Sequence, residues 1–234
     1  MCGRYTLSAE PALVAEHFGV ASVPADLKPR YNIAPSQPVP VIRRDHAGPR
    51  RLELLRWGLI PSWARDTAIG NRLINARAET LADKPAFRAA FRRRRCLIAA
   101  DGFYEWKKLA AGKQPYWVGR RDRRPFAFAG LWERWVPSES GGNPIESCVI
   151  VTTEANAVVR PVHNRMPVIV SPAHYDAWLD GETGAAALQA LLVPCPDEEM
   201  TAYPVAAAVN NPARDGSNLI QPLAPSADGD SGEL

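Results

Sequence analysis

The sequence predicts a single α+β domain, built mainly from antiparallel strands in a barrel-like sheet with short flanking helices. Strand-like segments follow one another with few helical segments between them, which favours antiparallel pairing. The 16 glycines and 22 prolines of this 234-residue chain separate these segments at short intervals, as turns do. Hydrophobic residues make up 46% of the chain, which suffices for a substantial core. We expect the domain to span residues 1–222 and a disordered acidic tail to follow at 223–234.

The first half of the chain alternates strands with two helices. Arg4–Leu7 reads as a strand, and Ser8 is the expected N-cap of a helix over 9–18 that Gly19 stops. Apolar runs predict two strands next, and a short helix ending in four consecutive arginines follows them. These three segments are the strands 38–43 and 52–59 and the helix 85–95.

The second half is richer in strands. The segments 96–107 and 115–120 flank the turn Ala111-Gly112-Lys113, so we expect them to pair as a hairpin. Apolar and β-branched runs, separated by polar or glycine-containing stretches, predict the remaining elements. These are the strands 125–132, 148–153 and 166–170, the helices 172–179 and 184–192, and a last strand over 204–209.

Composition excludes several classes of protein. No run approaches the ~18 apolar residues of a membrane helix, and the first residues lack the apolar core of a signal peptide, so we expect a cytosolic protein. The four cysteines are far apart, and no CxxC pair indicates a zinc ribbon or a thioredoxin-type site. We therefore expect reduced thiols, no metal and no cofactor.

The net charge is +3, and the basic residues are 23 arginines and only five lysines. Arginine binds phosphate through two hydrogen bonds and stacks on bases, so this bias fits a nucleic-acid partner. A GC-rich genome, which favours arginine codons, explains the same bias. Charge alone does not decide between these two interpretations.

Cys2 is the most informative residue. Removal of Met1, which requires a small second residue, exposes an α-amine beside a thiol. An α-amine has a pKa near 7.7–8.0, so it is far more nucleophilic at neutral pH than lysine. Such an amine attacks an aldehyde to give a Schiff base, and the thiol then closes a five-membered thiazolidine ring. The alternative is that Cys2 is a small residue buried in the core.

Polar residues stand beside aromatic residues or prolines in several short blocks. Such blocks suit a groove in which guanidinium groups meet phosphates and rings stack on unpaired bases. Trp63 reads as an exposed loop aromatic, whereas core packing is the better interpretation of most other tryptophans. Glu105, in an aromatic strand, could shuttle protons near neutral pH, or could simply face solvent. His163 titrates near neutrality, and its alternative role is structural.

Six blocks occur in the order of a known family. They are Met-Cys-Gly-Arg at residue 1, Asn-Ile-Ala-Pro at 32, Trp-Gly-Leu-Ile-Pro-Ser-Trp at 57, Asn-Ala-Arg-Ala-Glu-Thr at 75, Gly-Phe-Tyr-Glu-Trp at 102 and His-Asn-Arg-Met-Pro at 163. This order resembles the SOS response-associated peptidase (SRAP) family, whose members shield abasic sites in single-stranded DNA. Any one block is a weak signal, but six in order from residue 1 to 167 are specific.

The resemblance implies a role for each matched residue. Cys2, unmasked by loss of Met1, would capture an abasic deoxyribose as a thiazolidine, and removal of Met1 would be autoproteolytic. The other implied catalytic residues are Asn75, Glu105 and His163. The implied DNA-binding residues are Arg4, Trp63, Arg77 and Arg165. The expected partner is single-stranded DNA containing abasic sites, and the expected form is a cytosolic monomer that associates with the bacterial nucleoid on damage and not with membranes.

Two other functions remain open from the residues alone. Cys2 could be the N-terminal nucleophile of an amidohydrolase or peptidase. Alternatively, the chain could be a non-catalytic binder of single-stranded nucleic acid with a structural Cys2.

Overall fold

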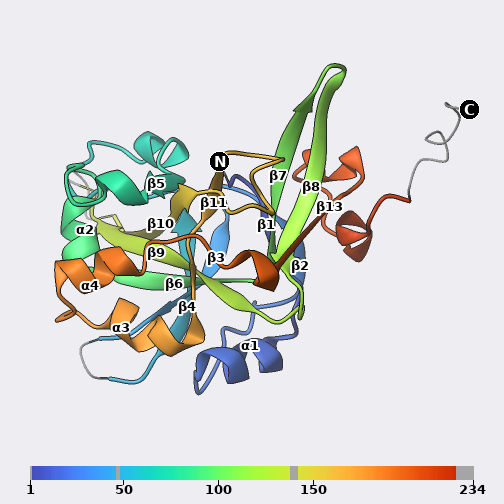
Figure 1. The fold of residues 1–234 in the computed structure, drawn as a ribbon. Helices are drawn as coiled ribbons and strands as arrows, with labels where there is room; N and C mark the ends of the chain where they lie inside the picture. The colour runs from blue at the N-terminus through green and yellow to red at the C-terminus, as the bar shows by residue number, and fades with distance from the viewer. Residues whose placement is uncertain (1, 46–47, 138–141, 225–234) are drawn as a thin grey trace, which may run out of the picture.

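The computed structural model describes residues 2–45, 48–137 and 142–224, and it confirms the α+β class (Figure 1). Five strands close into a barrel, because β10 pairs both with β4, in parallel, and with β9, while β3 and β6 complete the ring. These strands are β3 (Pro38–Arg43), β4 (Arg51–Trp57), β6 (Arg95–Ala100), β9 (Phe126–Trp135) and β10 (Ile145–Glu154). Three short strands extend the ring at its edges: β5 (Asn75–Arg77), β11 (Arg165–Pro167) and β12 (Ile169–Val170).

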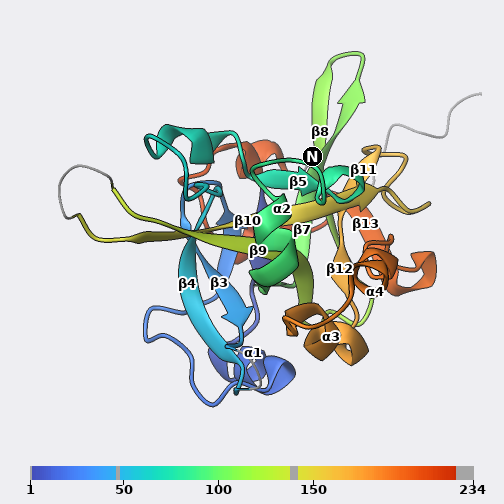
Figure 2. The same ribbon diagram turned by 90° about the vertical axis from the view of Figure 1, so that its left-hand side faces the viewer.

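A second sheet of five strands packs against the barrel, in the order β13-β8-β7-β1-β2. Its strands are β1 (Tyr5–Leu7), β2 (Arg30–Ile33), β7 (Gly102–Leu109), β8 (Gly112–Arg120) and β13 (Met200–Pro204). Short helices lie around the two sheets (Figure 2). They are α1 (Pro11–Phe18), α2 (Arg88–Arg93), α3 (Tyr175–Leu179), α4 (Ala185–Ala190) and the 3-10 turns η1 (Ala68–Asn71), η2 (Ala78–Thr80), η3 (Pro172–His174), η4 (Asp197–Glu199), η5 (Ala207–Asn210) and η6 (Ser217–Ile220).

Tyr5 joins the two sheets through the core. Its buried ring packs edge-on against Trp57 of β4, at 5.4 Å between centroids, and against Phe128 of β9, at 5.6 Å. Aromatic side chains of this size dominate core energetics. The opposite face of the second sheet carries a smaller buried cluster that holds the chain after β13 against β7 and β8; it consists of Tyr104, Trp117, Val205, Val209 and Leu219.

Several predicted element boundaries were wrong. The segment 96–107 is not one strand: it breaks at Asp101, so β6 enters the barrel and β7 enters the second sheet. The first helix begins at Pro11 with Glu10 as N-cap, because the Ser8 hydroxyl donates to the Asp101 carboxylate instead. The last strand is 200–204 and not 204–209, since residues 207–210 form a 3-10 turn.

Other predicted elements are correct in kind with shifted ends. The predicted helix 85–95 is shorter, and Arg95 already belongs to β6. The predicted strand 166–170 is two strands, β11 and β12, and the predicted helix 172–179 begins as the 3-10 turn η3. The predicted hairpin is present, with Leu109 paired to Gly112 at its turn. Strands β2 and β5 were missed.

The predicted domain end at 222 and tail at 223–234 stay predictions, because residues 225–234 lie outside the described part of the chain. Before that point the chain is still anchored, since the Leu223 N–H donates to the Pro204 carbonyl at 2.9 Å. Over the described residues, no helix is both long and apolar enough to cross a membrane.

A close contact between two glycines fixes the loop after β4. Gly58 has φ +127°, and a Cβ built on it would lie 2.5 Å from the carbonyl oxygen of Gly70. A Cβ on Gly70 would in turn meet the Gly58 oxygen at 2.8 Å. Only glycine fits such a backbone contact, which holds the loop carrying Trp63 against the end of β4.

We expect Gly58→Ala to lower the free energy of unfolding more than Gly112→Ala does. Gly112 has φ +131° but open space around its Cβ position, so its substitution costs backbone strain alone, about 1–3 kcal/mol. Gly58→Ala adds a clash with backbone that cannot rotate away. Urea unfolding measures both, with Gly181→Ala, which meets nothing within 4 Å, as the neutral control. Equal losses for Gly58→Ala and Gly112→Ala would show that the close contact is unimportant.

Candidate active site

The pairing of β1 with β7 places the start of the chain beside Glu105. Tyr5 lies opposite Phe103, and the Tyr104 N–H donates to the Arg4 carbonyl at 2.9 Å. Continuing this antiparallel register brings Gly3 opposite Glu105. Cys2 is fully buried, and its thiol points at the Arg4 carbonyl, 3.7 Å away.

Asn75 holds Cys2 from the barrel side. It begins β5, which runs parallel to β10 with Asn75 opposite Ile150. The Ile74 carbonyl just before it accepts hydrogen bonds from the Trp57 indole, at 2.9 Å, and from the Ile150 N–H. From this fixed position the Asn75 amide donates to the Cys2 carbonyl at 2.8 Å. The predicted catalytic residues Cys2 and Asn75 are therefore in direct contact.

Glu105 lies in an environment that disfavours its charge. The side chain is 2% exposed, and burial raises the pKa of its carboxyl to about 7, against the opposing effect of the chain's positive amino group. Burial, and then the Glu105 charge, raise the pKa of the Cys2 thiol strongly. Cys2 is thus a neutral thiol here, and Glu105 can gain or lose a proton near neutral pH. The alternative of a solvent-facing Glu105 is wrong.

His163 lies between β10 and β11, half-buried. The Arg165 N–H donates to its Nδ1 at 3.0 Å, closer than the Arg165 carbonyl at 3.3 Å, so Nδ1 is the acceptor and Nε2 carries the proton of the neutral ring. Burial lowers the pKa of this imidazole from its ordinary value, as do the positive charges of the chain's amino group, Arg165 and Lys108. His163 is therefore neutral at pH 7, with an Nε2–H that can donate a hydrogen bond.

The three predicted DNA-binding arginines differ in the contacts that their guanidinium groups already make within the protein. Arg4 donates to the Asn32 side chain at 2.8 Å and to the Val209 carbonyl at 2.9 Å. Arg165 forms two hydrogen bonds with the Glu79 carboxylate, at 2.6 and 3.0 Å, and another with the Thr152 carbonyl at 2.6 Å. Arg77 is exposed and forms no ion pair within the described part of the chain.

Trp63 is exposed, as predicted, with 59% of its surface accessible. It lies in the loop between β4 and η1, which the Trp135 indole anchors by donating to the Ala64 carbonyl at 2.7 Å. Of the tryptophans predicted to pack in the core, Trp57 is fully buried, whereas Trp106 and Trp132 are half-buried.

Strands β5, β7 and β11, which carry Asn75, Glu105 and Arg165, lie around the N-terminal end of the chain (Figure 1).

Sequence reasoning missed two residues that shape this site. Asn32 is 1% exposed, and its amide donates to the carbonyls of Asn211 and Arg214, at 3.0 and 2.8 Å, which fixes the C-terminal segment next to Arg4. Glu79 positions Arg165. Both belong to the six matched blocks, so block membership was the available signal, although nothing in the sequence showed their partners.

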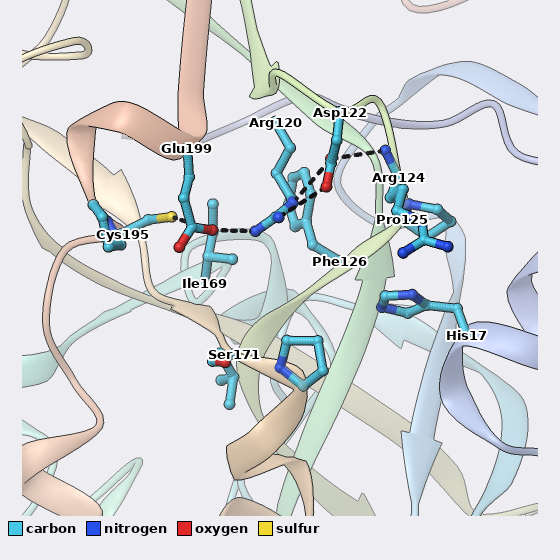
Figure 3. A pocket seen from close by; sticks show the side chains of 13 residues that line it. His17, Arg120, Asp122, Arg124, Pro125, Phe126, Ile169, Ser171, Cys195 and Glu199 are labelled. Carbon is cyan, nitrogen blue, oxygen red and sulfur yellow. Dashed lines mark hydrogen bonds and ion pairs between the residues drawn. The ribbon is translucent and has the colours of Figure 1, made fainter.

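A separate cavity of about 120 Å³ lies between α1 and the far end of β8 (Figure 3). Its lining includes His17, Arg120, Asp122 and Glu199, and none of the predicted site residues. Arg120 pairs with Asp122 at 2.9 Å and with Glu199, so its charge is already neutralised. Over the described residues, no group of three or more histidine, cysteine, aspartate or glutamate side chains is arranged to hold a metal.

Replacing Glu105 should change how stability depends on pH. The folded chain binds the Glu105 proton more tightly than the unfolded chain, so this group lowers the free energy of unfolding as pH rises from about 4.5 to 7. At 1.36 kcal/mol per pKa unit, Glu105→Gln should gain up to ~3 kcal/mol relative to wild type over this range. Urea unfolding between pH 5 and 8 measures the difference, with the exposed Glu182→Gln as control. A constant difference would contradict the raised pKa.

Comparison with known proteins identifies the family of this chain. The family model described as SOS response associated peptidase (SRAP) matches residues 1–212. The chain is 43% identical to the abasic site processing protein YoqW of Bacillus subtilis, over 94% of this chain and 99% of that protein. It is 34% identical to YedK of Escherichia coli, also named an abasic site processing protein, over 95% and 100%. A crystal structure of a Bacteroides thetaiotaomicron protein superposes with a TM-score of 0.86 at 28% identity, covering 95% of this chain and all of that one. The chain belongs to the SRAP family.

Proposed function

We propose that this protein processes abasic sites in single-stranded DNA by capturing the ring-opened deoxyribose on Cys2 after removal of Met1. The observation that carries this proposal is the hydrogen bond from Asn75 to the Cys2 carbonyl, which holds the start of the chain beside the buried Glu105. The names of the relatives support the substrate, since YoqW and YedK are both abasic site processing proteins.

The chemistry uses the amine first and the thiol second. The Cys2 amine attacks the C1′ aldehyde, and the resulting carbinolamine loses its oxygen as water to leave an imine. The thiol sulfur then bonds to the same carbon, and the thiol proton ends on the ring nitrogen. One C–N bond and one C–S bond form, the C1′–oxygen bond breaks, and one water leaves. No redox partner is required.

Each of the three residues around Cys2 either takes part in proton transfer and hydrogen bonding or orients the reacting groups. Glu105, with a pKa of about 7, takes a proton from the amine or from the neutral Cys2 thiol at ring closure. The neutral His163 ring donates a hydrogen bond from its Nε2–H to the sugar oxygen, which stabilises the charge that develops there as the deoxyribose ring opens. Asn75 fixes the Cys2 backbone and so the direction of the attacking amine.

In this proposal the DNA lies across the rim of the site. Arg4, Arg77 and Arg165 contact the phosphates, and Trp63 stacks on a base near the lesion. The family's name also supports a peptidase step, which we confine to hydrolysis of the Met1–Cys2 bond. A broader amidohydrolase would release peptide or amide products from other substrates, and a non-catalytic binder would form no adduct.

Cys2→Ala should abolish the stable cross-link while single-strand binding stays nearly intact, because the phosphate contacts lie elsewhere. Cys2→Ser keeps the amine but closes the ring poorly, so its adduct should be labile to heat. Intact-mass analysis, with and without an oligonucleotide bearing one abasic site, measures both. The undamaged oligonucleotide is the control. A heat-stable adduct with Cys2→Ala at the wild-type level would overturn the mechanism.

The ion pair at Arg165 predicts opposite salt effects for two variants. Each phosphate neutralised on a single strand contributes about −0.7 to the log–log salt slope. Arg77→Ala removes an unpaired cation, so the slope should flatten by about 0.7. Glu79→Gln releases Arg165, so the slope should steepen by up to about 0.7. Fluorescence anisotropy in a Cys2→Ala background, from 50 to 200 mM salt, measures these slopes.

The control for both variants is Lys28→Gln. Lys28 is exposed and lies beyond Arg30, which pairs with Leu7 at the end of β1 away from Cys2. If Lys28→Gln flattens the slope as much as Arg77→Ala, the effect comes from net charge and not from a local contact.

A further inference from the structure

The hairpin of β7 and β8 projects from the body of the protein on the side where the chain begins (Figures 1 and 2). Its strands stay paired out to Leu109 and Gly112, at the turn. Glu105 lies on the same strand, nearer the body. The hairpin therefore rises directly from the proposed active site.

The outer end of this hairpin carries a concentration of unpaired positive charge. Lys107, Lys108 and Lys113 are three of the five lysines in the chain, and no acidic residue occurs from 106 to 121. We call these three residues the lysine tip. None of them forms an ion pair with a described residue, whereas several arginines elsewhere are paired with carboxylates; examples are Arg43, Arg44, Arg94, Arg120 and Arg165.

Strand geometry directs part of this charge toward the site. Side chains two residues apart share one face of a strand, so Lys107 lies on the same face of β7 as Glu105, about 7 Å further along. Lys108 and Lys113 are directly opposite each other in the hairpin register and share the other face. Lys108 is also among the cations that act on His163, so the tip is within electrostatic reach of the proposed catalytic residues.

We propose that the lysine tip binds the phosphate backbone of the single strand on one side of the lesion; this inference rests on the proposed function. Lysine is a flexible, strongly hydrated point charge, which suits backbone contacts that carry no base identity. From Glu105 to Lys108, which lies opposite Lys113, the strand rises about 10 Å. At ~3.4 Å per nucleotide, as along one strand of duplex DNA, the tip reaches roughly three nucleotides from the reacting sugar.

The test is the triple variant Lys107→Gln, Lys108→Gln, Lys113→Gln in the Cys2→Ala background. Anisotropy measures its binding to single strands carrying a stable abasic analogue, with one arm fixed at ten nucleotides and the other one, three or six long, in both polarities. Three lost contacts should flatten the salt slope by about 2. Wild type should gain affinity as one arm, of one polarity only, lengthens past about three nucleotides, and the triple variant should lose that gain.

A second triple variant provides the matched control. Lys28→Gln, Arg121→Gln and Arg124→Gln also remove three exposed positive charges, and Arg121 and Arg124 follow the end of β8 opposite the hairpin turn. Thermal unfolding confirms that both variants fold. An unchanged slope in the tip variant, or an equal change in the control, would overturn the proposal. So would a loss of affinity that is the same for every arm length.

The same proteins separate this inference from the proposed function. With Cys2 restored, intact-mass analysis reports the cross-link independently of the binding measurement. If the protein forms the cross-link but the tip variant binds the single strands as wild type does, only the proposal for the lysine tip is overturned. Tip-dependent binding without any cross-link would overturn the capture chemistry and support the tip as a DNA-binding surface.

Discussion

The position of Cys2, the proposed nucleophile, depends on a buried carboxylate outside the candidate active site. Asp101, 5% exposed, lies where the chain leaves the barrel and enters the second sheet. Its oxygens accept hydrogen bonds from the Thr6 hydroxyl at 2.6 Å, the Ser8 hydroxyl at 2.7 Å and the Ala9 N–H at 2.9 Å. These bonds fix the end of β1 to the start of β7. Because the two strands are then held in register, the first residues of the chain have only one place to lie, beside Glu105.

Several of the arginines in this protein stabilise its architecture and do not simply add to its surface potential. Arg95, 4% exposed, donates to the carbonyls of Phe91, Arg92, Trp178 and Asp180 and so joins α2 to the end of α3. Arg43 pairs with Glu53 and Glu146 across barrel strands and covers the Trp132 ring. A guanidinium has five N–H donors in a planar fork and can satisfy four separate carbonyls, as Arg95 does, whereas the ammonium of lysine has only three donors. Counting arginines therefore overstates the charge that is free to meet an anionic partner.

The sequence was sufficient to predict the fold class and most strands, because hydrophobic periodicity and the glycines and prolines of turns are local signals. Prediction failed where the structure of a segment depends on a residue far away in the sequence. The break at Asp101 depends on bonds from Thr6 and Ser8, and β5 is a strand only because β10 lies beside it. For the site, the matched blocks identified Cys2, Asn75, Glu105 and His163 as candidates. The contact between Asn75 and Cys2 spans 73 positions of sequence, and the neutralisation of Arg165 by Glu79 spans 86, so neither was visible in a linear pattern.

The hydrogen bond from Asn75 ends on the backbone of Cys2 and not on its side chain. This hydrogen bond therefore does not depend on the side chain at position 2, since every residue has the same backbone carbonyl there. Once Met1 is removed, as proposed, such a scaffold would hold the terminal amine in place whatever side chain stands beside it. In protein engineering, other small residues could replace Cys2 at this position without redesign of the surrounding sheets. Each would bring its amine to a carbonyl compound and would close the ring with a different side-chain atom.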